Sequence, residues 1–154
     1  MRKMTRSMRA LLESELEKAI HGKGGLLADP SAAMGLLWVR RGLMFWARLF
    51  DLEARRLMDN QFRLGEPGTF MAQTTLAYEM EISDFHGWVA RKAFLMSVRA
   101  APEWDVLCER AGLPSDGKQL AEELRSWAKV LDGLDKRMRT LHTKYDLDDR
   151  RRTI

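Results

Sequence analysis

Cysteine is the scarcest residue in this 154-residue sequence, which contains only Cys108. One thiol cannot close an internal disulfide, so we expect packing to hold the fold and a reducing, cytoplasmic location. Long hydrophobic runs are also missing. The longest stretches without charge, residues 30–39 and 67–78, are shorter than the roughly 20 apolar residues that cross a bilayer. The N-terminal residues lack the basic and apolar regions of a secretory signal, and we expect no leader.

Histidine, a common metal ligand and general base, is nearly as scarce. His21, His86 and His142 are far apart, and none belongs to an H-E-x-x-H pattern or lies at helical spacing from a carboxylate pair. The GKGG segment at residues 22–25 lacks both the spacing of a phosphate-binding loop and a preceding strand. We therefore expect no metal, no cofactor and no enzymatic activity, and interpret Cys108 as a core residue rather than a nucleophile.

The charge excess is small, since 26 basic residues stand against 22 acidic ones and give a formal net charge of +4. The surplus lies within residues 1–63, where acidic residues are interspersed with the basic ones. A nucleic-acid footprint normally clusters Lys and Arg on one face, whereas a solvated surface mixes the signs. The pattern favours a solvated surface; a basic helical interaction module and contact with an anionic membrane stay as alternatives.

The hydrophobic content of 45%, with five Trp and six Phe, is enough for a packed core and excludes a disordered chain. Glycine and proline breakers separate segments of helical periodicity, and no segment has strand-like alternation. The sequence predicts a single all-α domain over residues 1–154. Its helices are expected at residues 5–20, 29–58, 70–100, 105–111 and 118–146, followed by a frayed tail over residues 147–154.

The predicted helix at residues 29–58 is apolar on two sides. Asp29 and Pro30 predict its start, as an N-cap acceptor and a proline in the first turn. One apolar line runs through Met34, Trp38, Phe45 and Leu49, and the other through Leu36, Val39, Leu43, Trp46 and Phe50. A helix that is apolar over so much of its circumference is expected to lie between neighbours on both sides, in the middle of a layered bundle.

Two residues stand out from the apolar pattern. Trp38 is followed by Arg40 and Arg41, and by itself this stretch is typical of a core tryptophan beside arginines whose head groups reach the solvent. His86 follows Phe85 at the edge of an apolar stripe, and by itself is typical of a buried histidine that is hydrogen-bonded to the backbone. The alternative for both residues is a place in a binding site.

The segments LLWVRRGLMF (residues 36–45) and AYEMEISDFHGWVARKAFLMSVRAAP (residues 77–102) resemble the two core segments of the glycolipid transfer protein family. This family consists of all-helical carriers of single sphingolipids between membranes. The AYEM, HGW and AAP motifs occur in the family's order, and the likeness extends from residues 11–18 to the last long helix. The resemblance implies a two-layer helical sandwich with a collapsible apolar chamber, transient peripheral membrane contact, and lipid transfer without chemical turnover.

The resemblance also implies roles for single residues. Trp38 corresponds to the indole platform under the first sugar of the head group, and His86 to the residue that hydrogen-bonds the ceramide amide. Trp88 of the HGW motif corresponds to a membrane-contact position. The acyl-chain pocket is expected to contain Met34, Phe45, Ile82, Phe94 and Val98.

The expected head group is a sugar. Family members that carry phosphorylated sphingolipids have arginine in place of Trp38 and a second arginine one turn earlier, where this chain has Met34. An indole suits the apolar face of a sugar ring, whereas a guanidinium suits phosphate. The resemblance therefore implies a glycosylated ceramide as the ligand.

The ligand's acyl chain has to be buried by the protein. Exposing a chain of roughly 16 carbons to water costs on the order of 13 kcal/mol, so the carrier must offer comparable apolar burial. The ten methionines suit a chamber for chains of differing length, because their side chains are unbranched and adaptable. They equally suit an ordinary core with gaps to fill.

The sequence departs from the family near its N-terminal end. In the family an Asp, an Asn and a Lys grip the amide and the sugar, from a helix before the one that residues 11–18 match, and this chain has no counterpart. Roughly the first two helices of the family fold are expected to be absent, which leaves apolar surface on the central helix open to self-association. We interpret the chain as an N-terminally truncated carrier or as a shortened relative, and expect poor transfer by this chain alone. Tyr145 lies near the family's C-terminal aromatic position.

Overall fold

The computed structural model describes residues 7–149 and 151, and within them it contains helices and no strand. The elements are α1 (Met8–Glu17), α2 (Ala32–Asp59), α3 (Thr69–Glu81), the 3₁₀ helix η1 (Ser83–Phe85), α4 (Trp88–Arg99), α5 (Trp104–Ala111) and α6 (Gly117–Lys144). The all-α fold class is therefore confirmed. No helix in the described ranges is both long enough and apolar enough to cross a membrane. Residues 5 and 6 of the first predicted helix lie outside the described ranges.

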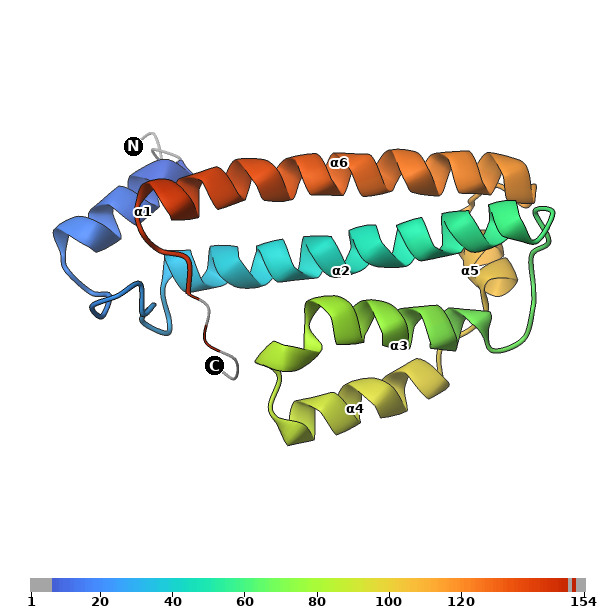
Figure 1. Cartoon of the computed structure of the whole chain (residues 1–154), viewed down its shortest axis with the longest axis horizontal. Helices are drawn as coiled ribbons and strands as arrows, with labels where there is room; N and C mark the ends of the chain where they lie inside the picture. The colour runs from blue at the N-terminus through green and yellow to red at the C-terminus, as the bar shows by residue number, and fades with distance from the viewer. Residues whose placement is uncertain (1–6, 150, 152–154) are drawn as a thin grey trace, which may run out of the picture.

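Helix α2 lies between α6 on one side and α3 on the other, with α4 beyond α3 (Figure 1). Met34 and Leu36, near its start, pack with α1 and the C-terminal segment in one buried cluster. Phe45 and Leu49, further along, pack with α3 and Trp104 in another. The prediction that this helix lies in the middle of a layered bundle is confirmed.

A buried polar cluster joins α2 to α6. Arg40 Nε donates to Asp135 Oδ1 at 3.0 Å, and Arg40 Nη1 lies 2.7 Å from His142 Nδ1. His142 Nε2 lies 3.2 Å from the carbonyl oxygen of Ala33. All three side chains are buried. Burial and the neighbouring Arg40 lower the pKa of His142, so the neutral imidazole accepts from the guanidinium and donates to the carbonyl.

The start of α2 differs from the prediction. The helix begins at Ala32, and Ser31 is the N-cap residue, whose hydroxyl accepts from the Met34 N–H at 3.0 Å. Asp29 and Pro30 precede this cap, and the peptide bond between them is cis. The carboxylate of Glu15 in α1 accepts from the first two N–H groups of the helix. The capping acceptors thus come from Ser31 and from a neighbouring helix, not from Asp29.

The long helix predicted at residues 70–100 is broken into three elements. Helix α3 ends at Glu81, η1 follows, His86 is extended with φ −97° and ψ 132°, and α4 begins at Trp88. Within this break Ser83 donates its hydroxyl to the carbonyl oxygen of Glu79. Side chains that can bond nearby backbone groups compete with regular helix in this way. The prediction of one continuous helix is wrong, and the break turns α4 back along α3 (Figure 1).

The C-terminal segment also differs from the prediction of a frayed tail over residues 147–154. Leu147 is buried in the cluster that contains the start of α2, and Asp149 is buried beside it. The Asp149 carboxylate accepts from the Leu27 N–H at 3.0 Å and pairs with Arg151. This pairing holds the pKa of Asp149 at about 2 despite its burial. Residues 150 and 152–154 lie outside the described ranges.

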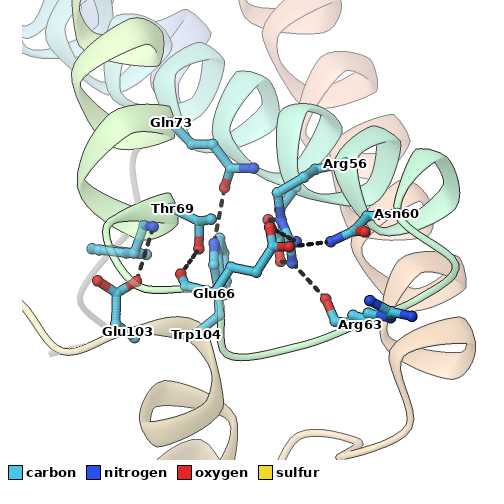
Figure 2. A network of polar contacts seen from close by, with 10 residues as sticks. Arg56, Asn60, Arg63, Glu66, Thr69, Gln73, Glu103 and Trp104 are labelled. Atoms are coloured by element: carbon cyan, nitrogen blue, oxygen red, sulfur yellow. Dashed lines mark hydrogen bonds and ion pairs between the residues drawn. The ribbon is translucent and has the colours of Figure 1, made fainter.

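A polar network connects the C-terminal end of α2 with α3 and α5 (Figure 2). The Glu66 carboxylate accepts from Arg56 at 3.2 Å and from Asn60 at 2.6 Å. Glu103 accepts from two backbone N–H groups at the start of α3, where the N-cap Gly68 offers no side-chain acceptor. Carboxylates from outside the helix thus satisfy donors that would otherwise be unpaired.

Replacing Asp135 should destabilise the fold strongly. In Asp135→Ala the buried Arg40 loses its main carboxylate partner, so the free energy of unfolding should fall by about 3–5 kcal/mol. Asp132→Ala, one turn earlier, removes an exposed pair with Lys136 and should cost less than about 1 kcal/mol. Urea unfolding followed by circular dichroism measures both variants. Equal losses would contradict the role given to the buried pair.

Candidate functional site

The break between α3 and α4 brings His86 against Trp38 of α2. Their ring centroids are 5.6 Å apart, with 33° between the ring planes. Tyr78 of α3 lies on the other flank of the histidine, with its hydroxyl oxygen 3.0 Å from His86 Nδ1. The two residues singled out in the sequence therefore lie together, although 48 positions separate them. The hydrogen bond of His86 Nδ1 goes to a side chain and not to the backbone.

Arg41 packs against the rings of Trp38 and Phe85. Its guanidinium carbon lies 4.9 Å from the centroid of the Trp38 ring and 3.5 Å from that of Phe85. Arg40 and Arg41 are buried, only 6% and 7% exposed, so the expectation that their head groups reach the solvent is wrong. Burial is possible because the C-terminal acids face both arginines, and Arg41 donates to the carbonyl oxygen of Asp149 at 3.4 Å.

The electrostatics of the site favour a neutral histidine. Burial lowers the pKa of His86 below its ordinary value of 6.5, and the positive charge of Arg41 lowers it further. Burial also raises the pKa of Tyr78 above its ordinary value of 10.0, and Arg91 only partly offsets this. At physiological pH the site therefore presents a neutral imidazole, a neutral phenol and the face of an indole.

The predicted acyl-chain residues fall into two regions and one isolated position. Phe45, Ile82 and Phe94 belong to the cluster that contains Tyr78, and Phe45 meets Phe94 edge to face at 5.9 Å. Met34 belongs instead to the cluster around α1 and the C-terminal segment. Val98 is buried but belongs to none of the three clusters of the described core. The structure thus brings together three of the five residues, in the cluster to which Tyr78, the hydrogen-bond partner of His86, belongs.

Trp88 lies on the outer side of α4 and is 68% exposed. Lys92 Nζ lies 4.1 Å from the centroid of its ring. Val89 and Met96 on the same helix are similarly exposed. One helix therefore presents an indole, two apolar side chains and an ammonium group to the surroundings.

The second apolar line of α2 is only partly covered. Val39 is 51% and Trp46 47% exposed. Trp46 contacts Phe50 at 5.7 Å between ring centroids, and Phe50 contacts Trp127 of α6 at 5.6 Å. We call Val39, Trp46, Phe50 and Trp127 the uncovered apolar face. Its exposure agrees with the expectation that apolar surface of the central helix lacks a covering element.

Sequence reasoning gave no functional role to Tyr78 or to the interior position of Arg41. Tyr78 lies eight residues before His86, which in a continuous helix would put the two residues about 12 Å apart, so the spacing alone gave no signal of their contact. Cys108 is buried, and burial raises the pKa of its thiol, which confirms the core interpretation. Among residues 7–149 and 151, no group of three or more His, Cys, Asp or Glu side chains is arranged to hold a metal ion.

Residues 2–112 match the family model of glycolipid transfer protein (GLTP). The chain is 32% identical to glycolipid transfer protein of Danio rerio over 88 residues and 30% identical to glycolipid transfer protein A of Xenopus laevis over 118 residues. These matches cover 57% and 77% of this chain but 39% and 51% of the relatives, so the chain spans about half of their length or less. The chain belongs to the glycolipid transfer protein family.

The fold matches a solved structure as well. The crystal structure of human ceramide-1-phosphate transfer protein, in complex with 12:0 ceramide-1-phosphate, superposes with a TM-score of 0.70 at 18% sequence identity. The match covers 94% of this chain and 65% of that chain. The expected helical sandwich of the family, lacking part of its length, is thereby confirmed.

An NMR titration of His86 should give a pKa below 6.5, and Arg41→Met should raise it without restoring 6.5, because burial is the larger cause. Arg91→Met, which removes an exposed charge on α4, should leave it unchanged. Since the folded-state pKa lies below that of the unfolded chain, His86 stabilises the fold above about pH 6.5, and this contribution is lost as the pH falls. A His86 pKa that is above 6.5, or that ignores the loss of Arg41, would contradict the assignment.

Proposed function

We propose that this chain is a non-enzymatic carrier module that binds one sphingolipid with a glycosylated head group for transfer between membranes. The single observation that carries the proposal is the contact of His86 with Trp38 on one side and with Tyr78, a member of the cluster of Phe45, Ile82 and Phe94, on the other. Polar groups and an indole face lie at the edge of an apolar interior. This arrangement suits a ligand with a polar head and a long apolar chain.

The ligand would place its first sugar on the indole of Trp38 and its amide at His86. A sugar ring has an apolar C–H face that packs on an aromatic ring. The acyl chain would enter between Phe45, Ile82 and Phe94, with Met34 and Val98 as the remaining members of the proposed pocket. Tyr78 and Phe94 now stack at 3.9 Å between centroids, so these rings would have to separate to admit a chain.

The arginines support a sugar rather than a phosphate. Arg40 is engaged by Asp135, His142 and Asp148 on the side of α2 that faces α6. Arg41 lies against the rings of Trp38 and Phe85, its Nη2 donates to the carbonyl oxygen of Asp149, and its Nη1 is buried without a hydrogen-bond partner among the described residues. Arg40 therefore has no free fork for phosphate, and Arg41 offers one buried nitrogen rather than the two parallel hydrogen bonds that recognise phosphate. The relative of known structure is named for a phosphorylated ceramide, which makes this lipid the informative competitor.

Trp38→Ala should weaken binding of galactosylceramide about tenfold, because stacking and apolar burial at the sugar are lost. Trp127→Ala, which removes an indole from the uncovered apolar face, should leave the affinity unchanged. Binding is measured with fluorescently labelled galactosylceramide in dilute vesicles, and ceramide-1-phosphate is the competing ligand. Tighter binding of ceramide-1-phosphate, or an equal loss in both variants, would contradict a sugar site at Trp38.

Transfer by this chain alone is expected to be poor. The Asp, Asn and Lys that the family resemblance places at the amide and sugar have no counterpart in the sequence. The uncovered apolar face is expected to favour self-association, because apolar patches of this kind seldom remain exposed on a monomer. Rapid transfer of galactosylceramide between vesicles by the 154-residue chain would contradict the first expectation.

Trp88 is proposed to touch the membrane during lipid uptake. An exposed indole beside a lysine suits the headgroup region, where aromatic rings and cations are both stabilised.

Trp88→Ala should lower partition onto phosphatidylcholine vesicles about tenfold, since much of the apolar contact with the interface is lost. Trp46→Ala, on the uncovered apolar face, is the matched control and should retain partition. Vesicle co-sedimentation measures both variants. A membrane contact elsewhere on the molecule would appear as unchanged partition of Trp88→Ala.

A further inference from the structure

Tyr78 is a buried hydrogen-bond partner of His86. Its side chain is 1% exposed, and its ring stacks on Phe94 with centroids 3.9 Å apart and planes 12° apart. The hydroxyl oxygen lies 3.0 Å from His86 Nδ1. Burial and the stacking on Phe94 of α4 both restrict the phenol ring. Its hydroxyl therefore has a set position relative to the imidazole.

The direction of this hydrogen bond follows from the choices open to each group. Among the described residues, His86 Nδ1 is the one acceptor within hydrogen-bond distance of the Tyr78 hydroxyl. If Nδ1 carried the proton and donated, the phenolic hydrogen would be buried without an acceptor, which costs about 1–3 kcal/mol. A phenol is also the better donor, and an unprotonated imidazole nitrogen the better acceptor. Tyr78 therefore donates to Nδ1.

The other ring nitrogen is then defined. A neutral imidazole carries one proton, so an accepting Nδ1 leaves that proton on Nε2. Within the described ranges, Nε2 makes no hydrogen bond, whereas Nδ1 is occupied by Tyr78. The ring thus has a single hydrogen-bond donor, Nε2–H, and its centroid lies 5.6 Å from that of Trp38.

We propose that Tyr78 is a positioning residue that holds His86 in its Nε2-protonated tautomer, so that Nε2–H is the hydrogen-bond donor of the ring. The inference rests on the proposed function, because this donor is the one that a bound lipid would meet at His86. A neutral ring also fits its surroundings, because Arg41 packs on the neighbouring Trp38 and its charge opposes a second cation there.

The tautomer can be read directly in the lipid-free protein. A nitrogen-15 long-range correlation spectrum at pH 8 should show an unprotonated Nδ1 and a protonated Nε2 for His86. In Tyr78→Phe, which keeps the ring and its stacking on Phe94, a second tautomer should become detectable. Tyr145→Phe changes the other tyrosine of the chain, which bonds Glu13, and should leave the His86 spectrum unchanged.

The direction of the pKa change provides a second readout that a purely structural role would not predict. A donor at Nδ1 stabilises the neutral ring, so its removal in Tyr78→Phe should raise the pKa of His86. If Tyr78 instead accepted from Nδ1–H, the same variant would lower it. A protonated Nδ1 in the wild type, or a lowered pKa in the variant, would overturn the proposal. Thermal unfolding of Tyr78→Phe confirms that the variant folds.

Lipid binding separates this inference from the proposed function. Tyr78→Phe should bind galactosylceramide about two- to fivefold more weakly, because only part of its molecules hold the competent tautomer. Binding of galactosylceramide with a protonated Nδ1 would refute the role of Tyr78 and leave the proposed function standing. The predicted tautomer without binding of any sphingolipid would do the reverse.

Discussion

The structure depends on the packing of one helix, α2, against neighbours on opposite sides. Helix α6 and α3 flank it, and α1 and the C-terminal segment close its first turns. An apolar helix with this many contacts can still slide or rotate, because apolar contacts are not directional. The pairing of Arg40 with Asp135 and His142 is directional and buried, and it determines which face of α2 meets α6. Trp38 is thereby turned toward α3 and the break that follows it.

The break at η1 is what makes a site possible. If α3 continued without a break, His86 would lie further along the same helix, past Trp38. Instead the extended backbone at His86 places its ring between Trp38 and Tyr78, and α4 returns so that Phe94 stacks under the phenol. The polar groups of the proposed site, His86 and the Tyr78 hydroxyl, therefore lie next to the apolar cluster that contains Phe94. A ligand that enters beside the histidine would meet aromatic rings at once.

Two features of the surface have the same origin. The uncovered apolar face and the indole of Trp88 both consist of apolar groups that the described residues leave partly exposed. They lie on different helices: most of the uncovered apolar face is on α2, with Trp127 on α6, and Trp88 is on α4. The matches cover 39% and 51% of the two relatives, so those proteins are longer than this chain. The closed packing of Tyr78 on Phe94 keeps the interior from adding a third exposed surface.

The sequence by itself determined the helical class and the central place of residues 29–58, and it singled out Trp38 and His86, which the structure brings into contact. Periodicity and breaker residues are local, and family motifs are read residue by residue. The predictions from sequence were wrong where residues distant in the sequence provide the hydrogen-bond acceptor or the opposite charge. Glu15 and Ser31 cap α2 in place of Asp29. Arg40 and Arg41 are buried opposite the C-terminal acids, although their head groups were expected in solvent.

Only the tertiary structure decided the break at Ser83, the anchoring of Leu147 and Asp149, and the meeting of Tyr78 with His86. Each depends on groups that approach through folding, and their hydrogen bonds or burial outweigh the local preference for helix or for solvent. The residue types of the site were therefore visible in the sequence. The direction of each hydrogen bond, and the protonation state that follows from it, became visible only when the helices were packed.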